Sequence, residues 1–259
     1  MKIGIFDSGI GGLTVLRQAM RSLPKEQYLF FADTAHVPYG TKTKEEILSY
    51  VDSAVNFMAE KGVKAIVIAC NTATSAAIGY LRAKYSIPIL GMEPAVKPAV
   101  QRNRGKRVMV IATPVTVREE KLKNLLAAVD KDHVVDLLAL PELVNFAEKE
   151  EFDSEAVRRY LKKEFSAYHL KDYSALVLGC THFNYFKDTL RSMFPPEAKL
   201  IDGCAGTVSH LANVLKEKGM LEDNRLTVEY YASMRKIEDE ASLRRIEGLF
   251  HRLDEMLPY

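Results

Sequence analysis

Short apolar runs alternate along the chain with longer segments in which hydrophobic positions recur every three to four residues. Runs of four to eight apolar residues are typical of buried strands, and the longer period is typical of helices. The runs lie at Lys2–Phe6, Tyr28–Ala32, Ala65–Ala69, Ile87–Gly91, Arg107–Ala112, Val134–Leu140, Ala175–Gly179 and Lys199–Asp202. Because these runs are continuously apolar, we expect parallel strands covered on both faces.

Helical spacing occupies most of the segments between these strands. A further amphipathic stretch, Ile237–Leu257, is expected to pack back on the first part of the chain, since such a stripe is more often core than a partner-binding surface. Strands that alternate with helices indicate an α/β fold with mainly parallel sheets flanked by helices. The other expected helices are Leu13–Ser22, Lys44–Lys61, Thr72–Lys84, Val117–Val129, Glu155–Tyr168 and Thr207–Lys218.

Two segments are near-copies of one another, 110 residues apart. KAIVIACNTAT (64–74) and SALVLGCTHFN (174–184) are each an apolar run that ends in a small residue and a cysteine, followed by small polar groups. The repeat predicts two similar α/β domains. We expect residues 1–96 together with 207–259 to form the first domain and residues 97–206 to form the second.

Polar residues follow several of the predicted strands. In open α/β sheets, ligands bind beyond the carboxyl ends of the strands, and helices that begin there favour carboxylates through their N–H groups. Two thiols that meet across a cleft can remove a proton from one side of a carbon and return one to the other. The residues at these strand ends are Asp7, Ser8, Asp33, Thr34, Cys70, Asn71, Thr72, Thr113, Thr116, Cys180, Thr181 and His182.

Each of these residues also has a structural interpretation. A single cysteine is more often a buried small hydrophobic residue than a catalytic group, and we interpret Cys204, which has no duplicated counterpart, in that way. The duplicated context favours catalysis for Cys70 and Cys180. We expect His182 to hold the second thiol as thiolate or to protonate a reacting group. Asp7 either binds a substrate ammonium or assists proton transfer, because its charge opposes a nearby thiolate.

Composition and charge bound the function. The chain has 259 residues, 47% hydrophobic and 27% charged, with a net charge of +2 and a sequence pI near 8.3. This balance does not indicate nucleic acid binding, and the basic stretch 101–107 is interpreted as a solvated turn. No apolar stretch reaches the roughly 18 residues of a membrane span, and no secretory signal is recognised, so we expect a cytoplasmic protein. The three cysteines are then expected to be reduced, and their spacing predicts no metal site.

A glycine-rich turn offers a rival interpretation. DSGIGGL (7–13) follows a strand, precedes a helix and is followed by Asp33, as in a dinucleotide-binding fingerprint. The third glycine of Gly-x-Gly-x-x-Gly is replaced by Thr14, and Asp7 would place a negative charge where a pyrophosphate binds. An NAD(P)-binding domain or oxidoreductase therefore remains a minor alternative.

Six motifs together carry a family resemblance. They are IGIFDSGIGGLTV, FADTAHVPYG, VIACNTAT, ATPVT, LGCTHF and IDGCAGTV, spread in order from residue 3 to about residue 208. With these motifs the chain resembles the glutamate racemases of the cofactor-independent aspartate/glutamate racemase family. The segment after the second cysteine, FNYF (183–186), departs from the usual Tyr or Phe followed by Pro-Leu, so we expect the start of the next helix to differ.

The resemblance implies that L- and D-glutamate are interconverted without a cofactor, with Cys70 and Cys180 as the two acid/base groups. It implies assisting catalytic roles for Asp7, His182 and Glu148, although Glu148 taken alone is a solvated helix-end charge. The implied substrate contacts are Asp7, Ser8, Pro38, Tyr39, Gly40, Asn71, Thr72, Thr113, Thr116, Thr181 and His182.

The resemblance also bears on architecture and partners. The family fold has two similar α/β domains with the active site in the cleft between them, and members are commonly homodimers. The product, D-glutamate, feeds peptidoglycan synthesis in bacteria. DNA gyrase is a partner by family analogy alone, since the sequence offers no motif for it. Two alternatives stay open, a racemase for aspartate or another acidic amino acid and a non-catalytic binding protein.

Overall fold

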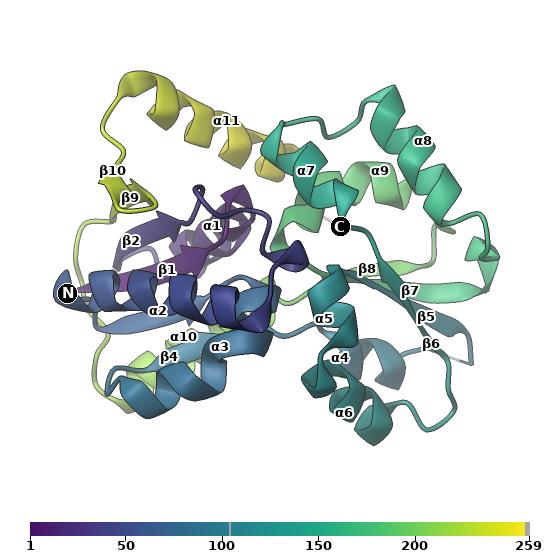
Figure 1. The fold of residues 1–259 in the computed structure, drawn as a ribbon, viewed down its shortest axis with the longest axis horizontal. Helices are drawn as coiled ribbons and strands as arrows, with labels where there is room; N and C mark the ends of the chain where they lie inside the picture. Colours follow the sequence, from purple (N-terminus) through teal and green to yellow (C-terminus); the bar gives the residue numbers. More distant parts are fainter. Residues whose placement is uncertain (104, 257–259) are drawn as a thin grey trace.

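The computed structural model describes residues 1–103 and 105–256, so the expected helix end at Leu257 lies outside the described residues. Two separate sheets, each covered by helices on both faces, lie side by side (Figure 1). The predicted α/β fold with parallel sheets is confirmed. The division into domains near residues 96 and 206 stays a prediction, and we refer below to each sheet with its helices as a lobe.

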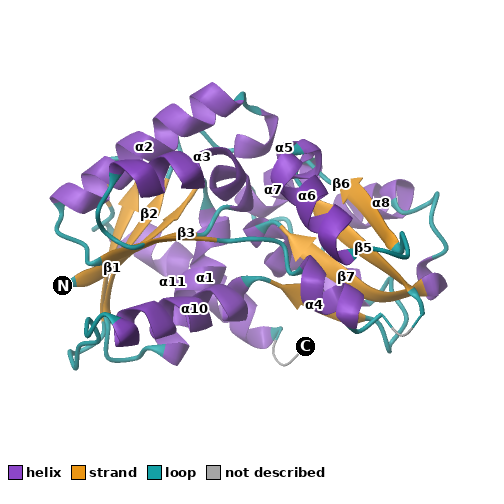
Figure 2. Cartoon of the chain, turned by 90° about the horizontal axis from the view of Figure 1, so that it is seen from below, coloured by secondary structure: helices purple, strands orange, loops and turns teal. Residues whose placement is uncertain are grey.

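The first lobe is built on a six-stranded sheet in the order β10-β9-β2-β1-β3-β4, parallel throughout except for β10. Helices α2 and α3 cover one face, and α1, α10 and α11 cover the other (Figure 2). The elements are β1 (Lys2–Asp7), β2 (Gln27–Ala32), β3 (Ala65–Ile68), β4 (Ile89–Gly91), β9 (Thr227–Ala232), β10 (Arg235–Lys236), α1 (Leu13–Ser22), α2 (Lys44–Glu60), α3 (Asn71–Lys84), α10 (Cys204–Glu217), α11 (Glu240–Glu255) and the 3-10 turns η1 (Ile10–Gly12) and η2 (Tyr39–Thr41).

The second lobe is built on a four-stranded parallel sheet in the order β6-β5-β7-β8. Helices α4 and α6 pack on one face, and α7, α8 and α9 pack on the other. The elements are β5 (Arg107–Ala112), β6 (Val135–Ala139), β7 (Tyr173–Gly179), β8 (Lys199–Asp202), α4 (Val96–Gln101), α5 (Pro114–Arg118), α6 (Glu120–Val129), α7 (Glu142–Glu148), α8 (Glu155–Glu164), α9 (Lys187–Arg191), η3 (Leu170–Asp172) and η4 (Thr181–Phe186).

Buried side chains form three clusters. One fills the space between the first sheet and α2 and α3, and another lies between the second sheet and α4 and α6. The third covers the remaining face of both sheets without a break, from Ile5 in β1 through Leu211 in α10 to Leu176 in β7. Burial on both faces explains why the central strands are largely apolar, and the third cluster joins the lobes through a common core.

Two strands were not predicted. Residues 227–232 form β9, which pairs in parallel with β2, and residues 235–236 form β10 at the sheet edge. The segment TVEYYA is rich in β-branched and aromatic residues, as strands are. It is mostly half-buried because β9 lies near the edge of the sheet, and the polar residues Thr227 and Glu229 hide it from a search for continuously apolar runs.

The helix predicted at Val117–Val129 is wrong in its bounds. The chain forms a short helix α5 that starts at Pro114, and a separate helix α6 that starts at Glu120. Glu119 between them has extended backbone, and its carbonyl accepts the N–H groups of Leu122 and Lys123. This break lets α5 point its first turn at the interface between the lobes while α6 covers the sheet.

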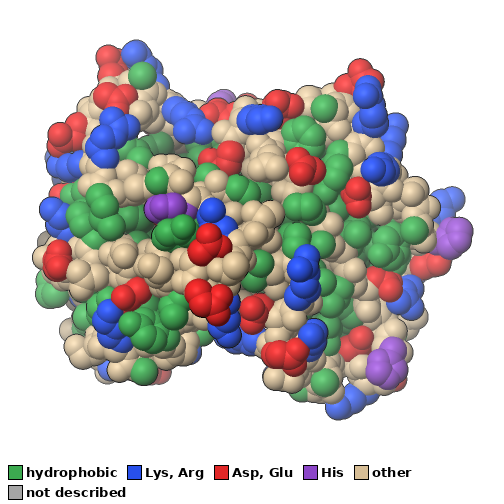
Figure 3. All heavy atoms as spheres, in the orientation of Figure 1, with side chains coloured by type: hydrophobic (Ala, Val, Ile, Leu, Met, Phe, Trp, Pro, Cys, Tyr) green, Lys and Arg blue, Asp and Glu red, His purple; other side chains and the backbone are tan. Residues whose placement is uncertain are grey.

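Within the described ranges, no helix is both long and apolar enough to cross a membrane. The face drawn in Figure 3 carries acidic and basic side chains interspersed with one another. This face therefore presents no extended basic surface of the kind that follows a nucleic acid backbone.

Candidate active site

The carboxyl ends of β1, β3, β5 and β7 come together where the two lobes meet. Thr181 Oγ1 donates to Asp7 Oδ2 at 3.0 Å, although Asp7 ends a strand of the first sheet and Thr181 follows a strand of the second. Cys70 and Cys180 follow equivalent strands, β3 and β7, and both are free thiols with 6% and 7% of their surface exposed. The duplicated motif thus places its two thiols in matching positions, one in each lobe.

Cys70 caps the first turn of α3. Its Sγ accepts the backbone N–H of Ala73 at 3.4 Å and lies 3.7 Å from the hydroxyl of Ser8. Burial raises the pKa of the Cys70 thiol, and the charge of Asp7 acts in the same direction, whereas the Ala73 N–H opposes both. The resting form of this sulfur is therefore the neutral thiol.

Cys180 lies at one end of a short relay. His182 Nδ1 is 3.8 Å from Cys180 Sγ, and His182 Nε2 is 2.7 Å from Glu148 Oε1, which also accepts the Ile10 N–H at 2.9 Å. Burial alone disfavours the charged imidazole, but the bonds to Cys180 and Glu148 outweigh it and raise the pKa of His182 well above its usual value. Burial also opposes the Glu148 carboxylate, yet the bond from His182 lowers its pKa. His182 therefore lies between a thiol and a carboxylate, where it can pass a proton between them.

Asp7 is fully buried at the interface between the lobe that carries Cys70 and the lobe that carries Cys180. Its Oδ1 accepts the Gly9 N–H at 3.2 Å and lies 3.3 Å from the Ser8 hydroxyl, while Oδ2 accepts from Thr181. Burial raises the pKa of Asp7, and these hydrogen bonds only partly offset it. The carboxyl can therefore take up a proton more readily than an exposed aspartate, which suits assistance to proton transfer.

Three hydroxyls join the lobes on the other side of the site. Thr72 Oγ1, in the first turn of α3, lies 2.8 Å from Thr113 Oγ1 and 3.3 Å from Thr116 Oγ1. Thr113 caps α5, where its hydroxyl accepts the Thr116 N–H at 3.3 Å. The first turn of the 14-residue helix α3 thus faces this hydroxyl group, an arrangement that favours a carboxylate.

The glycines of DSGIGG serve close packing between the lobes. A Cβ on Gly11 would lie 2.4 Å from Thr181 Oγ1 and 2.5 Å from His182 Nδ1, and a Cβ on Gly9 would lie 1.9 Å from Glu148 Oε1. The absence of a side chain lets the turn after β1 approach the residues around Cys180. This contact accounts for the glycine pattern without a pyrophosphate.

Pro38, Tyr39 and Gly40 form a turn that packs beside α5 where the lobes meet. A Cβ on Gly40 would lie 2.7 Å from Thr113 Cβ, so the turn packs directly on the second lobe. Tyr39 is buried, and its hydroxyl donates to Asp33 Oδ2 at 2.6 Å.

Asp33 supports this turn. Besides the Tyr39 hydroxyl, its carboxylate accepts from the Ser233 hydroxyl at 3.0 Å and lies 2.8 Å from His36 Nδ1. The sequence marked Asp33 as a residue at a strand end and as the acidic residue of a possible dinucleotide-binding fingerprint, and neither pattern predicted this supporting role.

The remaining candidates are also placed by the fold. Asn71 is buried in the first turn of α3, beside Cys70. Cys204 begins α10, with its Sγ 3.6 Å from Thr14 Oγ1 and 3.9 Å from Asn184 Nδ2. In the described part of the chain, no group of three histidine, cysteine or acidic side chains is arranged to hold a metal ion.

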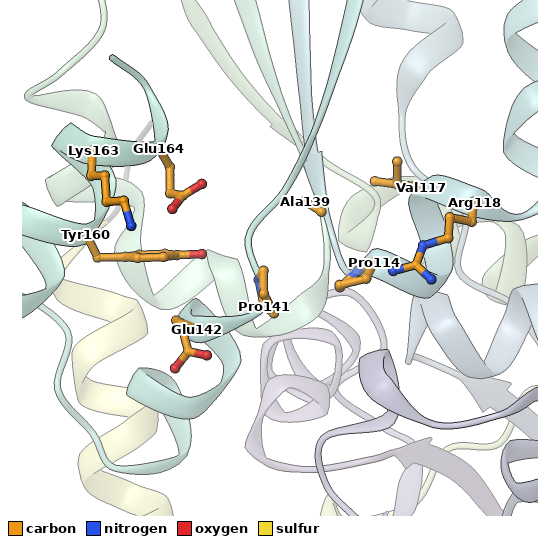
Figure 4. A pocket seen from close by; sticks show the side chains of 9 residues that line it. All are labelled: Pro114, Val117, Arg118, Ala139, Pro141, Glu142, Tyr160, Lys163 and Glu164. Atoms are coloured by element: carbon orange, nitrogen blue, oxygen red, sulfur yellow. The ribbon is translucent and has the colours of Figure 1, made fainter. Parts of the chain in front are cut away.

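A cavity of about 550 Å³ opens next to this region (Figure 4). Its walls come from α5, the end of β6, the start of α7, and α8. Pro114 is the neighbour of Thr113, but both thiols lie outside the lining. The cavity therefore borders the site without containing it. The lining residues are Pro114, Val117, Arg118, Ala139, Pro141, Glu142, Tyr160, Lys163 and Glu164.

Residues 12–211 match the Asp/Glu/hydantoin racemase family. The chain belongs to this family. The glutamate racemase of Lachnospira eligens is 55% identical to the chain over 262 residues, which cover 99% of each sequence. The resemblance inferred from the six motifs is therefore confirmed, and the chain is an enzyme of the racemase class. The alternative of an NAD(P)-binding oxidoreductase is set aside.

Solved structures of the same family share the fold. Glutamate racemase isoform RacE1 from Bacillus anthracis superposes with a TM-score of 0.84 at 29% identity, covering 96% of this chain and 93% of that one. The glutamate racemase of Francisella tularensis, solved in complex with D-glutamate, superposes with a TM-score of 0.80 at 28% identity, covering 96% and 92%.

Proposed function

We propose that the chain interconverts L- and D-glutamate by two proton transfers, one at Cys70 and one at Cys180. One sulfur, as thiolate, takes the α-proton and becomes a thiol. The other, as thiol, gives its proton to the opposite face of the same carbon and becomes a thiolate. The observation that carries the proposal is the pair of buried thiols at equivalent strand ends of two facing lobes. The D-glutamate complex of the Francisella relative supports the substrate.

The two sulfurs have different neighbours. His182 lies beside Cys180 and can exchange a proton with its sulfur, with Glu148 as the positioning carboxylate behind it. At Cys70, burial and the charge of Asp7 raise the thiol pKa, so this sulfur is the resting proton donor. Family analogy assigns Cys180 to L-glutamate and Cys70 to D-glutamate.

Carbanion formation is the larger energetic demand. An unperturbed thiol is ionised at neutral pH at a cost of about 2 kcal/mol. A turnover of about 1–1,000 per second corresponds to a barrier of roughly 13–17 kcal/mol. Preorganised donors around the α-carboxylate must therefore stabilise the developing charge. The first turn of α3 and the hydroxyls of Ser8, Thr72 and Thr181 supply donors at this site.

The other predicted contacts complete the substrate pocket. We assign Tyr39 and Gly40 to the wall beside α5 because their turn packs on Thr113. Pro38, Asn71, Thr113 and Thr116 line the same space in this proposal. Lobe closure on the substrate would exclude water and strengthen these hydrogen bonds.

Three wider roles belong to the same proposal. The enzyme forms a homodimer, acts in the cytoplasm and supplies D-glutamate for peptidoglycan synthesis. Light scattering of the purified protein tests the dimer, and growth of a strain without the enzyme, with and without added D-glutamate, tests the supply role. A monomer, or growth that D-glutamate does not restore, would contradict the respective role.

The deciding experiment follows the optical activity of L-glutamate by circular dichroism. Purified, dialysed protein is expected to bring the signal to zero, and added pyridoxal phosphate is expected to leave the rate unchanged. In deuterated water, the early product should carry solvent deuterium while the remaining substrate stays largely unlabelled, because separate groups remove and return the proton. Equal labelling of both would indicate a single base. Faster loss of the L-aspartate signal would favour the aspartate alternative.

A further inference from the structure

Helix α11, which packs on the first sheet, makes ion pairs and hydrogen bonds with helices of both lobes. On the first lobe, Asp254 pairs with Arg17 and Arg21 of α1, in the latter case at 2.7 Å. On the second lobe, Arg252 Nη2 lies 2.7 Å from Asp188 Oδ1, and Arg245 reaches the end of α7. Figure 1 shows α11 running from the side of β9 towards α7. The C-terminal helix was expected to pack on the first part of the chain, and it does so while also contacting the second lobe.

Arg245 contacts the turn that carries Glu148. Its Nε donates to Glu150 Oε1 at 2.5 Å, and its Nη2 donates to the carbonyl oxygen of Glu148 at 3.3 Å. Glu148 is the last residue of α7, and Glu150 has a positive φ of 59°, so the chain turns sharply here. A guanidinium that bonds an end carbonyl stabilises a helix C-terminus. Arg245 therefore holds both sides of this turn.

The same turn sets the position of the Glu148 carboxylate. That carboxylate lies 2.7 Å from His182 Nε2, and His182 Nδ1 lies 3.8 Å from Cys180 Sγ. The contacts of Cys70 with Ser8 and the Ala73 N–H involve no residue of α11. A change at Arg245 thus reaches Cys180 through two side-chain contacts, whereas its route to Cys70 is less direct and runs through the Ile10 N–H and the backbone that carries Ser8.

We propose that Arg245 is a positioning residue for proton transfer at Cys180, acting through the Glu148 turn and His182. The inference rests on the proposed two-thiol reaction. Without Arg245 the turn relaxes, the carboxylate leaves its best position on His182, and proton removal by Cys180 slows. Proton removal by Cys70 keeps its rate.

Activity alone cannot separate the two thiols. L- and D-glutamate have equal free energies in water, so kcat/KM must be the same in both directions for every variant. Deuterium at the α-carbon provides the separation, because it slows only the step that breaks the C–D bond. If the Cys180 step becomes slower, the isotope effect on kcat/KM rises for the enantiomer whose proton Cys180 removes and falls for the other.

The test compares Arg245→Gln with Arg244→Gln, its neighbour on α11, which pairs at 2.9 Å with Glu240 of the same helix. For Arg245→Gln we expect kcat/KM to fall about tenfold, within the roughly 10²-fold cost of a 1 Å misplacement. Its two isotope effects should move in opposite directions, in the same sense as those of Glu148→Gln. Arg244→Gln should match the wild type, and Arg245→Lys, which retains the charge but only one of the two bonds, should lie between.

Isotope effects in Arg245→Gln that stay unchanged, or that move together, would overturn the positioning role whatever the loss of rate. Equal effects of Arg244→Gln and Arg245→Gln would also overturn it. If Arg245→Gln does not fold, as judged by its thermal transition, the isotope effects of Arg245→Lys decide by the same criterion. Failure of the wild type to racemise glutamate would instead remove the proposed function.

Discussion

The two thiols have unlike surroundings. Cys70 accepts a helix N–H and lies beside a hydroxyl, whereas Cys180 lies beside an imidazole backed by a carboxylate. Burial and the Asp7 carboxylate hold Cys70 as a thiol, whereas the neighbour of Cys180 is a histidine whose own pKa is raised by its bonds to Cys180 and Glu148. Each lobe therefore surrounds its thiol with different proton-exchanging groups.

Replacement of either thiol should remove racemisation. In Cys70→Ala or Cys180→Ala, one face of the α-carbon loses its acid or base, and we expect turnover to fall by about 10²–10⁴-fold or more. Cys204→Ala is the matched control. Cys204 is also a buried thiol, but its contacts are with Thr14 and Asn184. Circular dichroism of L-glutamate measures all three variants. Unchanged turnover in either of the first two would refute the two-thiol mechanism.

The buried Asp7 carboxyl is expected to lower the free energy of unfolding at neutral pH. The pKa of Asp7 is higher in the folded state than in the unfolded chain. Its contribution to the free energy of unfolding is therefore fully present below the pKa of the unfolded chain and is lost as pH rises through the pKa of the folded state. Asp7→Asn is therefore expected to be more stable at pH 7, by about 1 kcal/mol, while losing activity. The gain should shrink as pH falls, because the wild-type carboxyl then becomes neutral.

Asp136 provides a control of opposite sign. Its hydrogen bonds from Arg107 lower the pKa of Asp136, so its contribution is present above the unfolded pKa and is lost as pH falls through the folded pKa. Asp136→Asn should destabilise the protein at pH 7, with the loss shrinking in acid. Urea unfolding from pH 4 to pH 8 compares the two variants. An Asp7→Asn protein less stable than wild type at pH 7 would contradict the argument.

Residue roles were predictable where a pattern repeats. The matched segments around Cys70 and Cys180 pointed to two thiols, and the structure places both at the interface between the lobes. Glu148 carries no such signal, since an acidic residue at a helix end is ordinarily solvated. Its bond to His182 depends on tertiary packing of α7 against η1 and η4, which no local pattern reveals.

At the scale of elements, the turn η1 is fitted to the second lobe. Gly11→Ala would place a Cβ 2.4 Å from Thr181 Oγ1 and 2.5 Å from His182 Nδ1. We expect a stability loss of about 1–3 kcal/mol from overpacking and a loss of turnover from displaced His182. Gly79→Ala in α3 is the control, since its Cβ would meet nothing within 4 Å, and it should gain up to about 1 kcal/mol.

Thermal unfolding and the glutamate assay together decide this prediction. If Gly11→Ala keeps wild-type stability and turnover, the turn has room to move and the close approach is not required.

The helices and strands that could be predicted were those whose sequences carry one clear hydrophobic pattern. Buried parallel strands such as β1 and β5 are apolar over most of their length, and the structure contains them as expected. Strand β9 lies near the sheet edge and is mostly half-buried, so its sequence carries a weaker signal. The break at Glu119 between α5 and α6 follows from the need of α5 to face the other lobe, a constraint that helical periodicity does not contain.

At the scale of the whole molecule, the lobes share one buried cluster that runs from the first sheet through α10 to the second sheet. The lobes also meet through hydrogen bonds between Asp7 and Thr181 and among Thr72, Thr113 and Thr116. Because the site is assembled from both lobes, a ligand that fills it must stabilise both at once.

We therefore expect D-glutamate to shift a single cooperative unfolding transition. The double variant Cys70→Ala/Cys180→Ala isolates binding from turnover. At a ligand concentration about 100 times its Kd, stabilisation should reach about 2.7 kcal/mol. For a chain of this size that corresponds to a rise in Tm of roughly 5–10 °C. Hydrogen exchange should slow in the first turns of α3 and α5, which carry Thr72 and Thr116. Two transitions, of which the ligand moves only one, would mean that the lobes unfold separately and that the shared core does not couple them.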